Sequence, residues 1–410
     1  MRLHKILLAA SLAGALLYPA IPAMAAGTGA TMVSGDMDGD GFEDVVALEA
    51  GHATISIICL DAQGEFTGHT QDYPDMPGMT ALTLADVDGD GRLDVLVSDA
   101  TDAASGVRVL LNAGEATLAA DVAYASGEAG PGPASLTAAD LNGDGFVDIV
   151  TAGGSAGTVS VLLNRGDGSF AAPVSYTVGG DVTAVAVADF NGDGIPDLVA
   201  SDTARDSILS LSGAGDGSFG APLAFTVGAG PVALTASDID GDGFQDLLVA
   251  DRDDDSVGVL MGLGDGSFAA PAFHPTGSQP GWIGSADLDG DGLADLVTDN
   301  YSDGSVSLFA NQGAGAFEAP QQLFLDYGSY GTLIMNIGGK PQLVSANLDA
   351  GVVVVTPAGS AVHASSKPPS SQVHRIGGTH DPQSSNGGGA LDLFTLALLA
   401  TFARRRSARG

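Results

Sequence analysis

Six short acidic segments recur along this chain of 410 residues, and their residue types and spacing suit the binding of one hard cation each. They follow the pattern D-x-(D/N)-G-D-G-x-x-D and begin at Asp36, Asp86, Asp140, Asp189, Asp238 and Asp287. Side-chain oxygens at positions 1, 3 and 5, a backbone carbonyl at position 7 and a carboxylate at position 9 can converge on one ion, and glycines at positions 4 and 6 permit the sharp turn that this requires. Because every ligand is an oxygen, the pattern predicts calcium rather than zinc or copper, and it favours calcium over magnesium, which demands tighter octahedral geometry.

The predicted ligands form three groups, and the six segments together imply about six calcium ions. The side chains at positions 1, 3 and 5 are Asp36, Asp38, Asp40, Asp86, Asp88, Asp90, Asp140, Asn142, Asp144, Asp189, Asn191, Asp193, Asp238, Asp240, Asp242, Asp287, Asp289 and Asp291. The carbonyls at position 7 are those of Phe42, Arg92, Phe146, Ile195, Phe244 and Leu293. The carboxylates at position 9 are Asp44, Asp94, Asp148, Asp197, Asp246 and Asp295.

The acidic segments have two alternative interpretations. An EF-hand shares the first six positions, but it needs Glu at position 12 and flanking helices. Position 12 holds Ala47, Val97, Thr151, Ala200, Val249 and Thr298, and strand-like sequence follows position 9, so the EF-hand is excluded. Turns that only connect strands are the other alternative, and six copies with complete oxygen ligands favour metal binding over it.

The segments belong to a longer internal repeat, with starting points 50, 54, 49, 49 and 49 residues apart. A second signature, G-x-G-x-F-x-x-P or a relative, follows each one, and its aromatic residue falls at Phe170, Phe219, Phe268 and Phe317. A further step of 49 residues from Asp287 leads to Asn336, where the acidic loop is shortened and uncharged. We therefore expect seven copies, the last of them degenerate.

Each copy has the pattern of four short strands. In the fourth copy the apolar runs are 182–189, 197–202, 207–213 and 221–227, separated by Gly, Asp and Pro. The first run of each copy is rich in small residues, which suits crowded strands beside a narrow axis. Four strands in a repeat of 40 to 50 residues predict an all-β fold, a seven-bladed β-propeller with four-stranded blades and a degenerate seventh blade.

Composition limits the partners of such a fold. Asp and Glu outnumber Lys and Arg by 50 to 14, giving a formal net charge of −36, while 45% of residues are hydrophobic and can form a sizeable core. The charge argues against nucleic-acid binding and against docking on anionic lipid through a basic face. One cysteine, Cys59, excludes an intramolecular disulfide, a Cys-based zinc site and an iron–sulfur cluster.

Both ends of the chain have the build of targeting segments. Residues 1–25 combine Arg2 and Lys5, an apolar stretch and a small-residue cleavage site, which predicts a secretory signal peptide. Residues 26–366 would then be the propeller, 367–386 a Ser/Pro/Gly-rich linker and 387–410 a tail with a glycine cluster, a short apolar run and three arginines. This tail resembles the GlyGly-CTERM sorting signal of Gram-negative surface proteins, although Asp392 interrupts its apolar run.

That tail resemblance implies removal by a rhombosortase-like protease and a place at the cell surface or in the medium. A permanent membrane anchor is the alternative, and membrane contact is expected only through the terminal segments.

Across about 340 residues, the acidic loops and the 49-residue period resemble the FG-GAP/VCBS repeats of integrin-α-type β-propellers. The resemblance implies that each loop joins the first two strands of a blade and binds calcium on one face of the disc. It also implies that ligands, an extracellular protein or glycan, engage the opposite face. Six calcium ions follow rather than seven, because the degenerate copy lacks the ligands.

Weaker motifs have simpler explanations. Arg165-Gly166-Asp167 spells an adhesive tripeptide, but the repeat itself places Gly and Asp in this turn. The segment 153–157 fits a serine-hydrolase elbow, yet a strand pattern follows it where a helix is required. His52, His69 and His274 are widely separated and show no metalloprotease spacing.

The binding face is predicted at the loops 201–207, 251–256 and 299–305, together with the entry segments before the first strand of each copy. Candidate contacts there are Trp282, Tyr301, Arg205 and Arg252, with packing between blades as the alternative for Trp282. The sequence thus predicts a non-catalytic binding or adhesion module with no convincing catalytic constellation. A propeller hydrolase or lyase acting on extracellular polysaccharide, and a structural surface-layer component, remain the alternatives.

Overall fold

The computed structural model describes residues 31–49, 54–60, 66–73, 78–100, 106–127, 132–324, 331–337, 340–347, 352–357 and 372–375. In these residues the regular structure is β throughout, apart from one turn of 3-10 helix, η1 (Arg252–Asp254). Among them, no helix has the length and apolar character needed to cross a membrane. The predicted signal peptide, 1–25, and the predicted tail, 387–410, lie outside the described residues.

Six four-stranded antiparallel sheets follow one another along the chain, each built from consecutive strands. The first three are β1 (Thr31–Gly35), β2 (Asp44–Glu49), β3 (Thr54–Leu60) and β4 (Phe66–Tyr73); β5 (Met79–Ala85), β6 (Asp94–Asp99), β7 (Gly106–Leu110) and β8 (Val122–Ala125); β9 (Ser135–Ala139), β10 (Asp148–Ala152), β11 (Thr158–Leu162) and β12 (Val174–Thr177). The next three are β13 (Val185–Ala188), β14 (Asp197–Asp202), β15 (Ser207–Leu211) and β16 (Leu223–Thr226); β17 (Pro231–Ser237), β18 (Asp246–Asp251), β19 (Ser256–Leu260) and β20 (Ala272–Pro275); β21 (Pro280–Ala286), β22 (Asp295–Asn300), β23 (Ser305–Phe309) and β24 (Gln321–Phe324). A further four-stranded sheet comprises β25 (Gly331–Ile337), β26 (Lys340–Asn347), β27 (Val352–Pro357) and β28 (Gln372–Arg375).

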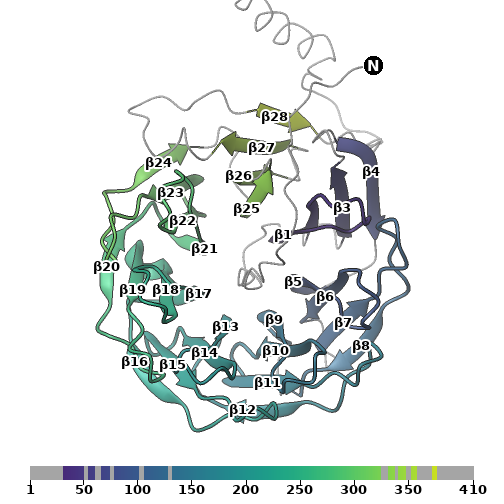
Figure 1. Cartoon of the computed structure of the whole chain (residues 1–410), viewed down its shortest axis with the longest axis horizontal. Helices are drawn as coiled ribbons and strands as arrows, with labels where there is room; N and C mark the ends of the chain where they lie inside the picture. Colours follow the sequence, from purple (N-terminus) through teal and green to yellow (C-terminus); the bar gives the residue numbers. More distant parts are fainter. Residues whose placement is uncertain are drawn as a thin grey trace, which may run out of the picture. The chain divides into compact units, whose positions relative to one another are not determined.

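The sheets are arranged as the blades of a propeller. The first strand of each sheet contacts the first strand of the next, in the order β1, β5, β9, β13, β17 and β21, and β25 contacts both β21 and β1. Figure 1 shows these first strands nearest the centre, with the fourth strands on the outside. The predicted all-β propeller with four-stranded blades is confirmed, and the four strands predicted in the fourth copy correspond to β13–β16.

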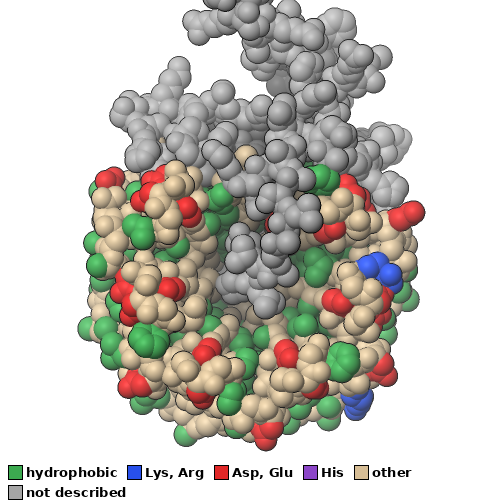
Figure 2. Space-filling model, in the orientation of Figure 1, with side chains coloured by type: hydrophobic (Ala, Val, Ile, Leu, Met, Phe, Trp, Pro, Cys, Tyr) green, Lys and Arg blue, Asp and Glu red, His purple; other side chains and the backbone are tan. Residues whose placement is uncertain are grey.

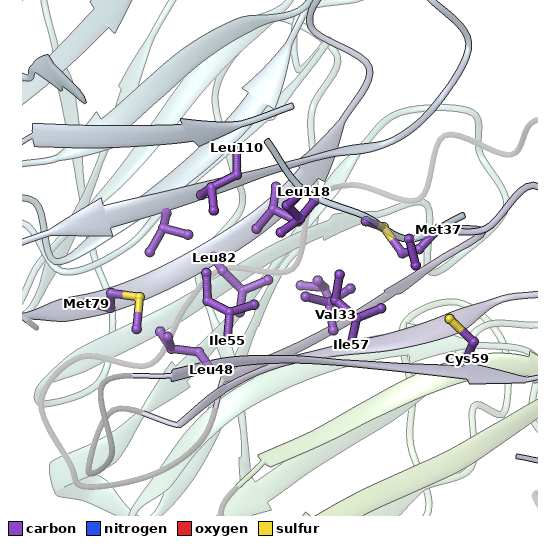
Figure 3. Close-up of a cluster of buried hydrophobic side chains, with 14 residues drawn as sticks. Val33, Met37, Leu48, Ile55, Ile57, Cys59, Met79, Leu82, Leu110 and Leu118 are labelled. Atoms are coloured by element: carbon purple, nitrogen blue, oxygen red, sulfur yellow. The ribbon is translucent and has the colours of Figure 1, made fainter. Parts of the chain in front are cut away.

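The hydrophobic core lies between neighbouring blades. In Figure 3, Val33, Leu48 and Ile55 from the first sheet meet Leu82 and Leu110 from the second, all of them at most 5% exposed. The other clusters combine residues of adjacent sheets in the same way, and the cluster of the sixth blade includes Leu343 of β26. A single blade could bury only part of its apolar surface, so the blades stabilise one another.

The repeated aromatic residue belongs to these interfaces. Phe170, Phe219, Phe268 and Phe317 each pack edge-to-face against a ring on the fourth strand of the preceding blade. The partner rings are Tyr124, Tyr176, Phe225 and His274, with centroid distances of 5.3, 5.8, 5.4 and 5.3 Å. The last three partners also recur every 49 residues, so the sequence itself carries the period of these aromatic pairs.

The segment 367–386, expected to be a linker, contributes a strand. Its residues Gln372–Arg375 form β28, which pairs with β27 as the fourth strand of the last sheet. The compact unit that contains the propeller extends to Ile376. Without these residues the last sheet would have only three strands.

Replacing Phe268 by Ala tests the packing between blades. Phe268 is 6% exposed and contacts both Phe190 and Phe225 across the interface of the fourth and fifth blades. We expect the free energy of unfolding to fall by about 3–5 kcal/mol, measured by denaturant titration. Phe273→Ala is the matched control, since Phe273 is 51% exposed on β20. An equal loss for both variants would contradict packing between blades as the main role of Phe268.

Candidate metal centre

Each acidic segment is the loop between the first and second strands of a blade. In the first blade β1 ends at Gly35 and β2 begins at Asp44, so the loop spans 36–43 and position 9 opens the second strand. The same arrangement recurs in the other five blades with an acidic segment. Equivalent loops of successive blades lie on the same face of a propeller. Figure 2 shows acidic side chains gathered at intervals around the face in view.

Hydrogen bonds from the loop backbone hold the first carboxylate of each loop in place. In the first loop, Asp36 Oδ1 accepts from the N–H of Gly39 at 2.7 Å, and Asp36 Oδ2 accepts from the N–H of Gly41 at 2.9 Å. Both glycines have a positive φ, 84° and 88°, which a residue with a Cβ adopts only at a cost. The expectation that positions 4 and 6 need glycine for a sharp turn is therefore confirmed.

In several loops the carboxylates converge closely enough to share one ion. Oxygens of Asp36, Asp38 and Asp40 lie within 4.8 Å of one another, and so do those of the corresponding residues of two other loops, Asp86, Asp88, Asp90, Asp287, Asp289 and Asp291. In the fifth blade the group is Asp238, Asp240 and Asp246, which brings in position 9. Such sets of hard oxygen donors with excess negative charge fit a calcium-type cation.

Two of the predicted side-chain ligands are amides instead of carboxylates. Oδ1 of Asn142 accepts from the N–H of Asp144 at 2.9 Å, and Oδ1 of Asn191 accepts from the N–H of Asp193 at 2.9 Å. In the other loops an aspartate at position 3 accepts the same bond, as Asp38 does from Asp40 at 3.1 Å. The amides therefore keep the loop conformation and lower its negative charge.

The carboxylate at position 9 has a second, structural role. It is at most 1% exposed in all six loops. Asp44 Oδ2 accepts from the N–H of Met37, and Asp44 Oδ1 accepts from the N–H of Leu60, both at 2.8 Å. All six loops repeat this pair of bonds, which ties the start of the loop to the end of the third strand.

Burial raises the pKa of these carboxyl groups. It does so despite the two backbone N–H donors, which favour the ionised form. The pKa rises to about 6 for Asp44, Asp94 and Asp148, and it is also raised for Asp197, Asp246 and Asp295. A bound cation would favour the charged form and oppose this shift.

Asparagine side chains connect three loops to the next blade, which the sequence analysis missed. Asn112 of the second blade donates through Nδ2 to the carbonyl of Met37 in the first loop at 2.8 Å. Asn164 and Asn311 donate in the same way to the carbonyls of Val87 and Ile239, at 2.8 and 2.9 Å. An Asn that recurs two residues before the first glycine of the second signature was the available signal. The acidic loops are thus part of the contact between blades.

Three of the other sequence-level candidates have structural roles. Asp167 accepts both the N–H and the hydroxyl of Ser169, and Asp216 and Asp265 make the same turn, so the tripeptide belongs to the repeat. The segment 153–157 leads into strand β11, which confirms that it is no hydrolase elbow. His274 packs between aromatic rings, while His52 lies outside the described residues and nothing is described of the side chain of His69.

Of the candidate ligand contacts, Trp282 is not available. It is 3% exposed and lies in a buried cluster that joins Val297 of its own sheet to Leu343 of β26 in the next sheet, so the expectation of a surface contact is wrong and the alternative, packing between blades, is confirmed. Tyr301 is 39% exposed. Arg205 and Arg252 are partly exposed and pair with Asp202 and Asp253 at 2.7 and 3.0 Å. These three residues lie between the second and third strands, at the ends of the blades opposite the acidic loops.

Comparison with known proteins identifies the repeats. The FG-GAP-like repeat pattern matches residues 36–97, 140–200, 189–249 and 238–298. Among solved structures, an Agrocybe aegerita lectin in a study of the recognition of non-reducing terminal N-acetylglucosamine is 22% identical, with a TM-score of 0.53 over 78% of this chain and 86% of that chain. A complex of BBS1N with ARL6DN gives 11% identity and a TM-score of 0.56 over 79% of this chain and 91% of that chain.

Enzymes have the same architecture. Virginiamycin B lyase from Staphylococcus aureus is 15% identical, with a TM-score of 0.53 over 80% of this chain and 95% of that chain. At these identities the likeness concerns the fold alone. None of the curated proteins is significantly similar to this sequence.

Two alanine substitutions in the fifth loop separate the structural role of position 9 from metal binding. Asp246→Ala removes the acceptor for two N–H groups, those of Ile239 and Gly262, and should lower the free energy of unfolding by about 1–3 kcal/mol per bond even in EDTA. Asp242→Ala frees only the exposed N–H of Phe244, which water can satisfy. It should leave stability in EDTA within about 0.5 kcal/mol of the parent. Equal losses in EDTA, measured by denaturant titration, would contradict this division of roles.

The raised pKa values predict how stability depends on pH when no metal is bound. With a folded-state pKa near 6 for Asp44, Asp94 and Asp148 against 3.8 ordinarily, the folded chain binds more protons than the unfolded chain between these values. The free energy of unfolding should therefore fall as pH rises from about 4 to about 6 and level off above. Asp94→Asn should flatten the slope in EDTA. Asp167→Asn should not, because hydrogen bonds from Ser169 lower the pKa of that exposed carboxyl.

Proposed function

Because the chain belongs to the FG-GAP-like repeat family, we propose that it is an exported, calcium-binding β-propeller that acts as a non-catalytic binding or adhesion module. The observation that carries this proposal is the regular recurrence of the acidic loops on one face. Calcium held there would leave the loops at the other ends of the blades free to contact a partner. That division suits a rigid recognition surface better than a catalytic site.

The free energy of calcium binding indicates what the ions do for the stability of the fold. Extracellular modules bind calcium with dissociation constants of roughly 0.1–1 mM. At about 2 mM free calcium and a dissociation constant of about 0.1 mM, each site adds about 1.8 kcal/mol. Six independent sites would add about 11 kcal/mol, comparable with the whole stability of an ordinary domain. Since Asn112, Asn164 and Asn311 tie three loops to the next blade, calcium would stabilise blade interfaces as well as single loops.

We assign the sheet β25–β28 as a degenerate seventh blade. Contacts of β25 with both β21 and β1 support the assignment, as does the packing of Leu343 in the cluster of the sixth blade. β25 ends at Ile337 and β26 begins at Lys340, so two residues stand where the other blades have eight. This blade therefore has no room for the acidic ligands, and we propose six calcium ions.

The proposed binding face contains Tyr301, Arg205 and Arg252 together with acidic residues of the same loops. Its ligand would be an extracellular protein or a glycan, and the likeness in fold to a lectin supports the second class. The net charge of −36 opposes nucleic acid as a partner.

Export and sorting are the remaining parts of the proposal. Residues 1–25 would direct export, and the tail 387–410 would be removed by a rhombosortase-like protease at the surface of a Gram-negative bacterium, with membrane contact only through these termini. The mass of the C-terminal peptide of the protein from its native host tests this. Recovery of Arg404–Arg406 in the mature protein would contradict it.

A glycan and surface-protein array, probed with and without EDTA, tests the binding function. We expect retention of specific ligands in calcium, a loss of at least tenfold for Tyr301→Ala, and no loss for Phe273→Ala on the outer strand β20. Melting curves of each variant in calcium verify folding. Release of cleaved product from a retained polysaccharide would instead support a hydrolase or lyase, and an absence of any retained ligand would favour a structural surface component.

A further inference from the structure

The six acidic loops do not carry the same number of carboxylates. The loops of the first, second, fifth and sixth blades have an aspartate at each of positions 1, 3, 5 and 9. The third loop, 140–148, and the fourth loop, 189–197, have Asn142 and Asn191 at position 3, so each keeps three carboxylates. An amide oxygen can still coordinate calcium, but it brings no negative charge. The two loops of lower charge belong to neighbouring blades.

The convergence of the carboxylates divides the loops in the same way. In each of the four loops with aspartate at position 3, oxygens from three carboxylates lie within 4.8 Å of one another. The third and fourth loops, both of which the structure describes in full, contain no such group. Arg92 pairs with Asp90 in the second loop, but both side chains are partly exposed, where an ion pair contributes little. An ion in the third or fourth loop would therefore meet fewer carboxylates already in place.

The amides also donate to carboxylates of their own loops. Asn142 Nδ2 donates to Asp144 Oδ2 at 3.0 Å, and Asn191 Nδ2 donates to Asp197 Oδ1 at 3.2 Å. Each bond relieves part of the repulsion between carboxylates before any ion binds. The third and fourth loops thus gain less from a bound cation than the loops with four carboxylates.

The third and fourth loops also lack the asparagine link to the next blade. Asn112, Asn164 and Asn311 provide this link for the first, second and fifth loops. The equivalent residues after the third and fourth loops are Gly213 and Gly262, whose N–H groups make the usual bond to position 9 of their own blade. Glycine has no side chain that could reach the carbonyl at position 2 of the preceding loop. That carbonyl is thus without an asparagine donor in the two loops of lower charge.

Calcium affinity in oxygen-ligand loops depends on the number of charged ligands and on the rigidity of the site. We propose that the six sites form two classes, in which the third and fourth loops bind calcium more weakly than the other four and release it first when calcium falls. This inference rests on the proposed function, because it presupposes calcium in the loops. Phe190, at position 2 of the fourth loop, packs against Phe268 of the fifth blade, so the third loop is the less restrained of the two.

The position of the two weaker sites gives them a regulatory role. The third and fourth blades are neighbours, so a fall in calcium would remove ions from one side of the ring while the other loops keep theirs. The fourth blade also carries the loop 201–207, with Arg205, on the face that we assign to ligand binding. A change in calcium would therefore act first beside this part of the binding face.

Native mass spectrometry of the full chain at increasing free calcium, which counts the bound ions, tests the two classes. The parent should bind four ions first and two more at roughly tenfold higher calcium. In Asn142→Asp/Asn191→Asp, which restores aspartate at position 3, the two late ions should need at least about threefold less calcium. Asp88→Asn should move the second loop into the weaker class, so that three ions bind in each step. Gln279→Glu is the matched control and should keep the pattern of the parent, because it makes the same amide-to-carboxylate change at an exposed residue outside the loops.

Hydrogen exchange identifies the loops that fill last. Starting from a calcium concentration between the two steps, further calcium should slow exchange of the amides in 140–148 and 189–197. Exchange in 36–44 and 238–246 should stay unchanged, because these loops already hold their ions. The reverse pattern would contradict the assignment of the weaker sites.

A single step of six equivalent ions in the parent would overturn the two classes. So would a second step that Asn142→Asp/Asn191→Asp leaves unchanged. Melting in EDTA shows whether this double variant folds. If it does not, Asp88→Asn decides, and four ions in its first step would overturn the proposal. Binding of no calcium at all by the folded parent would instead refute the proposed function itself.

Discussion

The fold depends on a buried carboxylate that accepts two backbone N–H groups at the start of each second strand. In the first blade, Asp44 joins the N–H of Met37 at the start of the loop to that of Leu60 at the end of the third strand. Because these donors lie far apart in sequence, this one side chain sets both the exit of the loop and the register of the blade. The loop therefore has a fixed shape before any ion is considered, and its other carboxylates are positioned by the same backbone.

The loop and the blade interface are one structural unit. Asn112, Asn164 and Asn311 attach three loops to the following blade, and the rings of Tyr124 and Phe170 represent the aromatic contacts that recur along the same interfaces. The apolar clusters each span two blades. Neutralising the carboxylates of one acidic loop would therefore affect the following blade as well. Such coupling explains how a chain with one cysteine and a net charge of −36 can hold its blades together.

The sequence predicts the repeating features well, because period and residue type suffice for them. The 49-residue spacing locates the acidic loops, the four strands per blade and the aromatic residue at 170, 219, 268 and 317. It does not reveal which partner each side chain meets across an interface, so the Asn links were missed and the sequence left two alternatives for Trp282, a surface contact or packing between blades. β28 was also missed, since Gln372–Arg375 lies in Ser- and Pro-rich sequence and is a strand only because it pairs with β27.

The first and last sheets share no strand, and this has a mechanical consequence. β1–β4 come entirely from the start of the described chain and β25–β28 entirely from its end, so no sheet mixes strands from both. Every other pair of neighbouring sheets is also joined by a covalent connector, whereas β1 and β25 meet by contact alone. Unfolding by force or heat would therefore begin where β25 meets β1. A circular permutant, in which the present ends of the chain are joined and new ends are made between two other sheets, would also be possible.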